Sequence, residues 1–172
     1  SRRLFFSLYF SKQQQQRIAP YQQQALQVCP GAKVVAEENL HLTLFFLGQV
    51  SAEQQAQLLH AAARIHAAAF EIELDYLAGF QQPKILYLAP SVVPAPLLQL
   101  QQQLAQLCQA QGFTEPHPQY RPHITLARQA IYQGQQDVTP LKLNVQQFAL
   151  YQSRRQDEQL QYLPLQCFNL TS

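Results

Sequence analysis

The sequence contains no tryptophan or methionine, only five glycines, and few charged residues. Charged side chains make up 13% of the 172 residues, and the formal net charge is +2. This balance argues against binding a long nucleic acid through many phosphate contacts, because each contact normally uses a lysine or arginine. It leaves open a small anionic ligand or the end of a nucleic acid strand.

Cysteine is scarce as well. Cys29, Cys108 and Cys167 are far apart and never form a CxxC pair, so neither a disulfide framework nor a zinc ribbon is supported. This usage predicts a reducing, cytoplasmic location. No apolar run reaches 18 residues, which argues against a membrane-spanning helix. The opening SRRLFFSLYFSK has a short apolar run that a serine interrupts, so it predicts a first strand rather than a signal peptide.

Alternating and helical patterns predict an ordered series of elements. Strands are expected where apolar and polar residues alternate, and helices where Leu and Ala recur among glutamines. The predicted strands cover residues 2–10, 33–36, 39–47, 70–78, 85–89, 123–128, 142–152 and 159–168. The predicted helices cover residues 11–28, 52–69 and 94–110, and the first two follow Ser-x-x-Gln capping boxes.

The order of these elements nearly repeats. Strand, Gln-rich helix and HLTL strand in the first half match strand, Gln-rich helix and HITL strand in the second. This predicts an internal duplication over approximately residues 2–80 and 83–168. We expect an α+β fold in a single bilobal domain over residues 1–172. Its two pseudo-symmetric lobes would carry mainly antiparallel sheets that face a central cleft, with helices on the outside.

The HLTL and HITL motifs begin at His41 and His123, 82 residues apart. Because successive side chains of a strand point to opposite faces, His41 and Thr43 should share one face, about 7 Å apart along the strand. A threonine hydroxyl can donate to a phosphate oxygen, and an imidazole can hold or release a proton near neutral pH. Each motif therefore supplies half of a phosphate site.

Two such strands related by a pseudo-two-fold axis would place two imidazoles on opposite sides of one phosphorus. In-line displacement needs this arrangement, with a base beside the entering oxygen and an acid beside the leaving oxygen. The symmetry itself does not decide which of His41 and His123 is the acid. An alternating strand can also carry His and Thr for solvation alone, although residue frequencies make two matching copies a rare coincidence. A zinc site that adds His117 has no supporting spacing.

The paired motifs HLTL and HITL resemble the signature of the 2H phosphoesterase superfamily. RLFFSLYF, ENLHLTLFFLG, RPHITLAR and FALYQS, in this order, are similar to the bacterial RNA 2′,3′-cyclic phosphodiesterases, also called 2′-5′ RNA ligases. The resemblance implies a substrate with a 2′,3′-cyclic phosphate, as an RNA end or a nucleotide, and no metal or cofactor. It implies that His41 is the proton donor to the leaving 3′ oxygen and His123 the proton acceptor from water. Thr43 and Thr125 would hold phosphate oxygens.

Two arginines are further candidates for phosphate binding. Arg121 lies two positions before His123, on the same face by alternation, and could bind phosphate bidentately. Arg128 matches an arginine that often follows the second motif in this family, although alternation would turn it to the other face. Aromatic residues near the motifs could stack on a base, or simply belong to the core. They are Phe5, Tyr9, Phe45 and Tyr120.

The expected function is metal-independent hydrolysis of RNA 2′,3′-cyclic phosphate ends to 2′-phosphate ends, with possible reverse 2′-5′ ligation, by a monomer that does not bind membranes. One alternative is a cyclic phosphodiesterase acting on a small nucleotide or an ADP-ribose cyclic phosphate. Another is a module that binds a nucleotide or RNA end without turnover. Binding without turnover would not require two proton-transfer groups, which argues against the second alternative.

Overall fold

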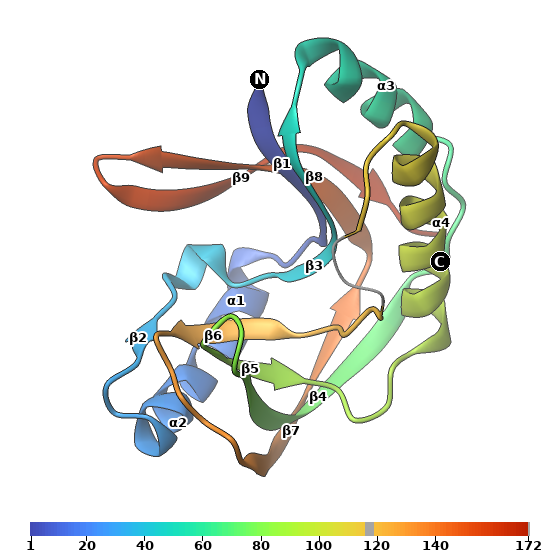
Figure 1. The fold of residues 1–172 in the computed structure, drawn as a ribbon. Helices are drawn as coiled ribbons and strands as arrows, with labels where there is room; N and C mark the ends of the chain where they lie inside the picture. The colour runs from blue at the N-terminus through green and yellow to red at the C-terminus, as the bar shows by residue number, and fades with distance from the viewer. Residues whose placement is uncertain (116–118, 172) are drawn as a thin grey trace.

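The structure is a computed structural model that describes residues 1–115 and 119–171 (Figure 1). Its strands are β1 Arg2–Leu8, β2 Lys33–Val34, β3 Leu42–Val50, β4 Phe70–Phe80, β5 Ile85–Ala89, β6 Ile124–Arg128, β7 Gln135–Val145, β8 Gln147–Gln156 and β9 Gln159–Asn169. Its helices are α1 Lys12–Ile18, α2 Pro20–Val28, α3 Ala52–Ala62 and α4 Ala95–Ala110, with a 3-10 turn, η1, at Glu37–Asn39. In the described residues, no helix is long and apolar enough to cross a membrane.

The strands form one antiparallel sheet in the order β7-β4-β5-β6-β3-β1-β8-β9, and β2 pairs with the far end of β6. The two central strands, β3 and β6, carry the two motifs. They are joined at one residue pair, Leu42 with Ile124. Both side chains are fully buried, so the junction between the two halves of the sheet is anchored in the core.

Each side of this junction has the same arrangement of strands. On one side β1 pairs with the motif strand β3 and then with β8, and on the other side β5 pairs with β6 and then with β4. The predicted α+β class with mainly antiparallel strands is therefore confirmed. The hairpin of β8 and β9 extends beyond the rest of the sheet (Figure 1).

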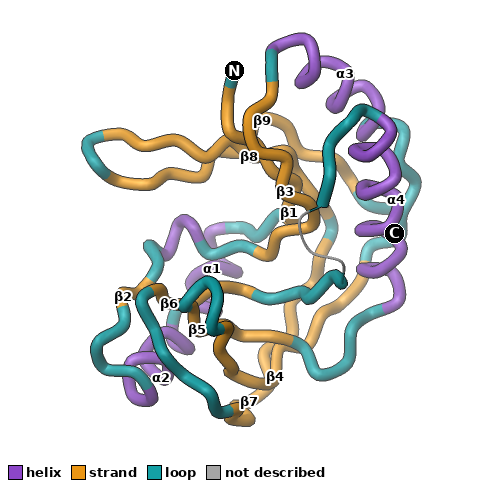
Figure 2. Tube along the Cα trace, viewed as in Figure 1, coloured by secondary structure: helices purple, strands orange, loops and turns teal. Residues whose placement is uncertain are grey.

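The helices lie in two groups on the outside of the molecule (Figure 2). Helix α4 packs on β3 and on α3, whereas α2 packs on β5 and β6 and α1 contacts β7. The helix that follows β1 in the chain thus covers strands of the other half. This exchange ties both halves into one continuous apolar core.

Two predicted helices have different limits in the structure. The helix expected over 11–28 is interrupted at Ala19, because Pro20 starts α2 and a proline cannot donate the backbone hydrogen bond of a helix interior. The helix expected over 52–69 ends at Ala62. The chain beyond it joins the sheet edge, where the Ala69 amide donates to the carbonyl of Thr171 at 2.7 Å.

Two strand predictions are corrected as well. The strand expected over 39–47 begins at Leu42, after η1, and passes through Gly48 (φ +80°) to Val50 with a bulge. The single strand expected over 142–152 belongs to two strands, β7 and β8. Strand β7 starts at Gln135 and includes Pro140, which is tolerated because β7 lies at the edge of the sheet.

We predict that Gly79→Ala destabilises the protein by about 1–3 kcal/mol. A methyl group at Gly79 would overlap the backbone carbonyl oxygen of Tyr132 and lie 3.2 Å from that of Ile85, and backbone atoms cannot move aside cheaply. Gly31→Ala is the matched control, because a methyl group there meets no heavy atom within 4 Å. Urea unfolding measures both variants, and equal stability of the two would contradict the close approach at Gly79.

Candidate active site

The single pair that joins β3 and β6 determines how the motif residues face one another. When its antiparallel register is extended by one residue in each direction, His41 lies opposite Thr125 and Thr43 lies opposite His123. The two histidines then occupy one diagonal of the junction and the two threonines the other. Diagonal neighbours on adjacent strands are about 7–8 Å apart. This spacing leaves room for one phosphoryl group between the imidazoles.

The burial pattern agrees with this geometry. Leu42, Leu44, Ile124 and Leu126 are buried, whereas the histidines and threonines of both motifs are half-buried. The apolar side chains hold the strands in the core, and the polar ones share the open face. The expected alternation along both motifs is therefore confirmed.

Both histidines are held by the same backbone contact. Nδ1 of His41 lies 2.8 Å from the carbonyl oxygen of Asn39, and Nδ1 of His123 lies 2.7 Å from that of Arg121. A carbonyl oxygen only accepts hydrogen bonds, so Nδ1 carries the proton in each case. Nε2 is consequently the nitrogen without a proton in the neutral form of each ring. In His41 it accepts from the Thr43 hydroxyl at 2.9 Å.

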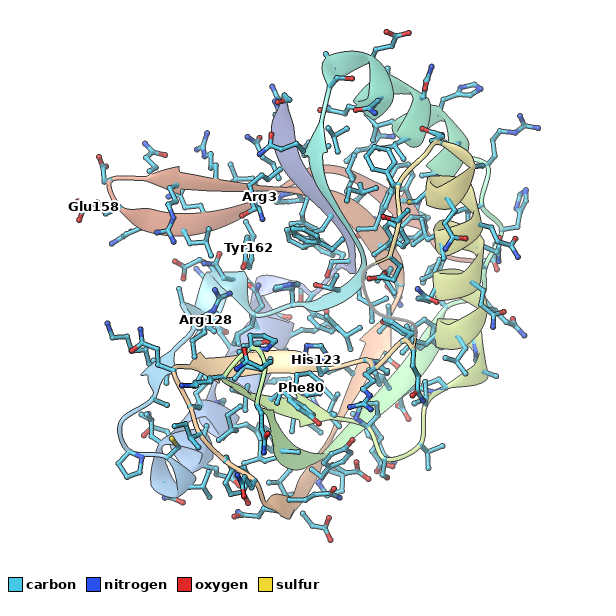
Figure 3. The ribbon with its side chains drawn as sticks, in the orientation of Figure 1. Arg3, Phe80, His123, Arg128, Glu158 and Tyr162 are labelled. Carbon is cyan, nitrogen blue, oxygen red and sulfur yellow. The ribbon has the colours of Figure 1, made fainter. Side chains whose placement is uncertain are left out.

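Aromatic rings fix the orientation of both imidazoles. The His41 ring lies 5.1 Å from Phe5 and 4.8 Å from Tyr162, measured between ring centroids. The His123 ring lies 5.0 Å from Phe80 and 5.3 Å from Tyr87. Figure 3 shows His123 and Phe80 together on the half opposite Tyr162.

The surroundings of His41 favour its neutral form. The pKa of His41 is lowered from the usual 6.5 to about 4, mainly by burial and to a smaller extent by the positive charges of His123 and Arg128. The Asn39 carbonyl, which accepts from Nδ1–H, acts in the opposite direction. In the unliganded protein His41 is therefore neutral at pH 7. A nearby bound anion would raise this pKa, because it favours the imidazolium form.

A cavity of about 490 Å³ opens beside His41. Its described lining contains no acidic side chain, whereas four of the eight arginines of the chain line it. The lining residues are Arg3, Phe5, His41, Thr43, Phe46, Thr125, Arg128, Ser153, Arg154, Arg155, Leu160 and Tyr162. This composition suits a ligand that carries several negative charges.

A bulge places Arg128 at the cavity. Strand β6 has one extra residue between the pairs Leu86–Ala127 and Tyr87–Thr125, so Leu126 and Ala127 are both buried in succession. This shift returns Arg128 to the face of Thr125, where simple alternation would not put it. Its guanidinium donates to the Tyr162 hydroxyl at 3.0 Å; both residues are labelled in Figure 3.

The remaining candidate residues predicted from the sequence do not all lie at the cavity. Arg121 is exposed with its guanidinium 6.0 Å from the centre of the Phe80 ring, outside the set that lines the cavity. Phe45 is fully buried, and the Tyr120 hydroxyl donates to the Thr43 carbonyl at 2.9 Å. Tyr9 packs against a small cluster around Phe5.

No group of three metal-ligating side chains is found in residues 1–115 and 119–171. His117, considered as a zinc ligand, lies outside the described residues.

Sequence reasoning missed the contribution of the β8–β9 hairpin. Ser153, Arg154 and Arg155 come from β8, and Leu160 and Tyr162 from β9. The Asn39 side chain attaches this hairpin to the segment before His41. It donates to the carbonyl of Leu160 at 2.8 Å and accepts from the amide of Tyr162 at 3.2 Å. No local pattern reveals this long-range contact.

Comparison with known proteins adds a family and a fold. The model of the 2′-5′ RNA ligase superfamily matches residues 10–157. The RNA 2′,3′-cyclic phosphodiesterase of Escherichia coli K12 is 32% identical over 98% of this chain and 97% of its own length. A crystal structure of E. coli LigT with 3′-AMP superimposes with a TM-score of 0.87 at 29% identity, over 99% of both chains. A crystal structure of a phosphoesterase superimposes with a TM-score of 0.88 at 31% identity, over 99% of both chains.

We predict that His41 titrates with a midpoint of about 4 in the unliganded protein. NMR of the imidazole resonances as a function of pH measures this midpoint. Arg128→Gln should raise this midpoint, because a neighbouring positive charge is lost. Saturating inorganic phosphate should raise it as well, because a nearby anion favours the imidazolium. A midpoint near 6.5 without ligand, or one that phosphate does not move, would contradict the assigned environment of His41.

Proposed function

Because the chain belongs to the 2′-5′ RNA ligase superfamily, we propose that it hydrolyses RNA 2′,3′-cyclic phosphate ends to 2′-phosphate ends by acid–base catalysis with His41 and His123. One observation carries this proposal. The two imidazoles are held by equivalent Nδ1–H bonds to carbonyls at the junction of β3 and β6. With the proton on Nδ1, Nε2 is the nitrogen of each neutral ring that can accept a proton.

The reaction begins with water beside His123. Nε2 of His123 takes a proton from the water as its oxygen forms a bond to phosphorus, and the bond from phosphorus to the 3′ oxygen breaks. Nε2–H of His41 then protonates that leaving 3′ oxygen, so the phosphate remains on the 2′ oxygen. Acid and base thus act on opposite sides of one phosphorus, as in-line displacement requires.

Binding of the anionic substrate prepares His41 for this role. In the unliganded protein, burial keeps its pKa near 4 and its Nε2 accepts from Thr43. The negative phosphate raises the pKa of His41, so Nε2 gains a proton. The Thr43 hydroxyl is then free to turn and donate to a phosphate oxygen.

Three side chains would stabilise the charge that accumulates on the non-bridging oxygens. Thr43 and Thr125 lie on the second diagonal of the junction and offer hydroxyl donors. Arg128 adds a positive charge at the edge of the cavity. Such donors, fixed before the reaction, stabilise a transition state more than water does. Arg121 would act through its carbonyl on His123 rather than by binding phosphate.

These groups perform both proton transfers without a metal ion or nucleotide cofactor. The same arrangement would catalyse the reverse reaction when a 5′-hydroxyl of RNA replaces water, forming a 2′-5′ bond. We place the enzyme in the cytoplasm as a monomer, as its cysteine usage and family resemblance imply.

A second candidate is a phosphodiesterase of small nucleotides or of an ADP-ribose cyclic phosphate. Crystal structures of E. coli LigT with ATP and with NADP⁺ resemble this fold, with TM-scores of 0.81 and 0.84 and 29% identity. The arginine-lined cavity would suit the phosphates of such ligands. A pure binding module is the third reading, and tight product binding without turnover would support it.

We predict that His41→Ala and His123→Ala each lower kcat on a cyclic-phosphate oligonucleotide by about 10²–10⁴-fold, the usual contribution of a general acid or base. His60→Ala on α3 is the matched control and should keep full activity, because His60 is not among the residues that line the cavity. Hydrolysis is followed by chromatography of the product, with its 2′-phosphate identified by NMR. Unchanged rates in both motif variants would refute the two-histidine mechanism.

Removal of metals should leave the rate unchanged. Because the proposed proton transfers use only protein groups, dialysis against EDTA is expected to preserve kcat in the same assay. Loss of activity that Zn²⁺ or Mg²⁺ restores would contradict this part of the proposal.

A further inference from the structure

The cavity extends well beyond the space that a cyclic phosphate needs. From His41 it reaches along β1 to Arg3 and along the β8–β9 hairpin to Arg154 and Arg155. Arg3, Ser153 and Tyr162 form one row across three adjacent strands, because Arg3 pairs with Ser153 and Ser153 pairs with Tyr162. The lining is therefore a continuous surface that leads away from His41.

The positions along this surface are regularly spaced. Phe5, which contacts His41, lies two residues from Arg3 on the same face of β1. Arg155 lies two residues beyond Ser153 on the same face of β8. Two residues of a strand span about 7 Å, so the backbone of Arg155 lies about one extended nucleotide along β8 from Ser153, the residue that pairs with Arg3.

The charge of this surface is uncompensated. Within the described residues, no carboxylate forms an ion pair with Arg3, Arg154 or Arg155, and the Arg154 guanidinium contacts the neutral side chains of Gln156 and Gln161. Glu158 lies at the tip of the hairpin, away from Tyr162 (Figure 3). Phe46, 39% exposed, lies under the Arg3 guanidinium at 5.4 Å and offers a ring on which a base can stack.

We propose that Arg3 and Arg155 bind the phosphodiester backbone of the RNA strand on the 5′ side of the cyclic phosphate. This rests on the proposed function, in which His41 protonates the leaving 3′ oxygen. That oxygen stays on the terminal ribose of the strand, so the strand leaves the site on the side of His41, where the arginine-lined surface begins. Water, or the 5′-hydroxyl of a second strand, enters beside His123. The enzyme therefore prefers an RNA end to a mononucleotide.

The test compares kcat/KM for uridine 2′,3′-cyclic phosphate with that for a hexanucleotide ending in the same group. The wild type should favour the hexanucleotide by at least about tenfold, and R3Q and R155Q should each lower this ratio several-fold. R2Q is the matched control, because Arg2 is the neighbouring exposed arginine on the other face of β1. R155Q lies on an exposed hairpin strand, so it remains informative if R3Q folds poorly.

Salt dependence gives a second readout that does not require turnover. The Kd of a labelled hexanucleotide with a 2′-phosphate end is measured by fluorescence anisotropy at several salt concentrations. Each lost contact to a single strand should reduce the slope of log K against log[salt] by about 0.7, so R3Q/R155Q should reduce it by about 1.4. R2Q should leave the slope unchanged.

The outcomes separate this proposal from the proposed function. Equal kcat/KM for both substrates in the wild type, or a slope that R3Q/R155Q leaves unchanged, overturns strand binding while the hydrolase assignment stands. Another outcome is that a 5′-triphosphate on the mononucleotide raises its kcat/KM to the value of the hexanucleotide. In that case the arginines bind a nucleotide polyphosphate instead of an RNA strand, and the proposal is wrong. If neither substrate is hydrolysed, the proposed function fails, and the anisotropy slopes still decide strand binding.

Discussion

The pairing of Leu42 with Ile124 is the constraint on which the site depends. Within residues 1–115 and 119–171, it is the one residue pair that joins β3 to β6, and both side chains are fully buried. A shift of one residue in this register would turn every side chain of one motif to the opposite face. The core therefore selects the register, and the register sets each histidine opposite the threonine of the other motif. The relative placement of the two motifs therefore follows from hydrophobic packing.

The two halves are alike in strand order but differ in electrostatics. Both imidazoles are held through Nδ1 by a carbonyl two residues earlier. The half containing His41 also carries the Asn39-anchored hairpin and the arginine-lined cavity, whereas His123 lies among Phe80, Tyr87 and the exposed Arg121. This difference assigns direction to an otherwise symmetric pair. The charged strand would lie beside His41 and the small nucleophile would enter beside His123.

Much of this arrangement can be predicted from the sequence, because the strongest signals are local. The motif faces, the capping boxes at Ser11 and Ser51 and the strand at Ile85–Ala89 all follow from alternation or capping chemistry. Positions set by distant contacts could not be found in this way. Strand β7 was missed because Pro140 is acceptable only at a sheet edge, and Arg128 faces the cavity only because of a bulge. The hairpin residues at the site depend on Asn39, more than 100 residues away.

The most direct measurement is a crystal structure of the protein with an oligonucleotide that ends in a 2′-phosphate. The account predicts that Nε2 of His41 and Nε2 of His123 both lie within hydrogen-bond reach, about 2.6–3.2 Å, of oxygens on opposite sides of the same phosphorus. Thr43 and Thr125 would contact its remaining oxygens. A phosphate that contacts only one of the two histidines, or that binds away from the junction of β3 and β6, would contradict the account.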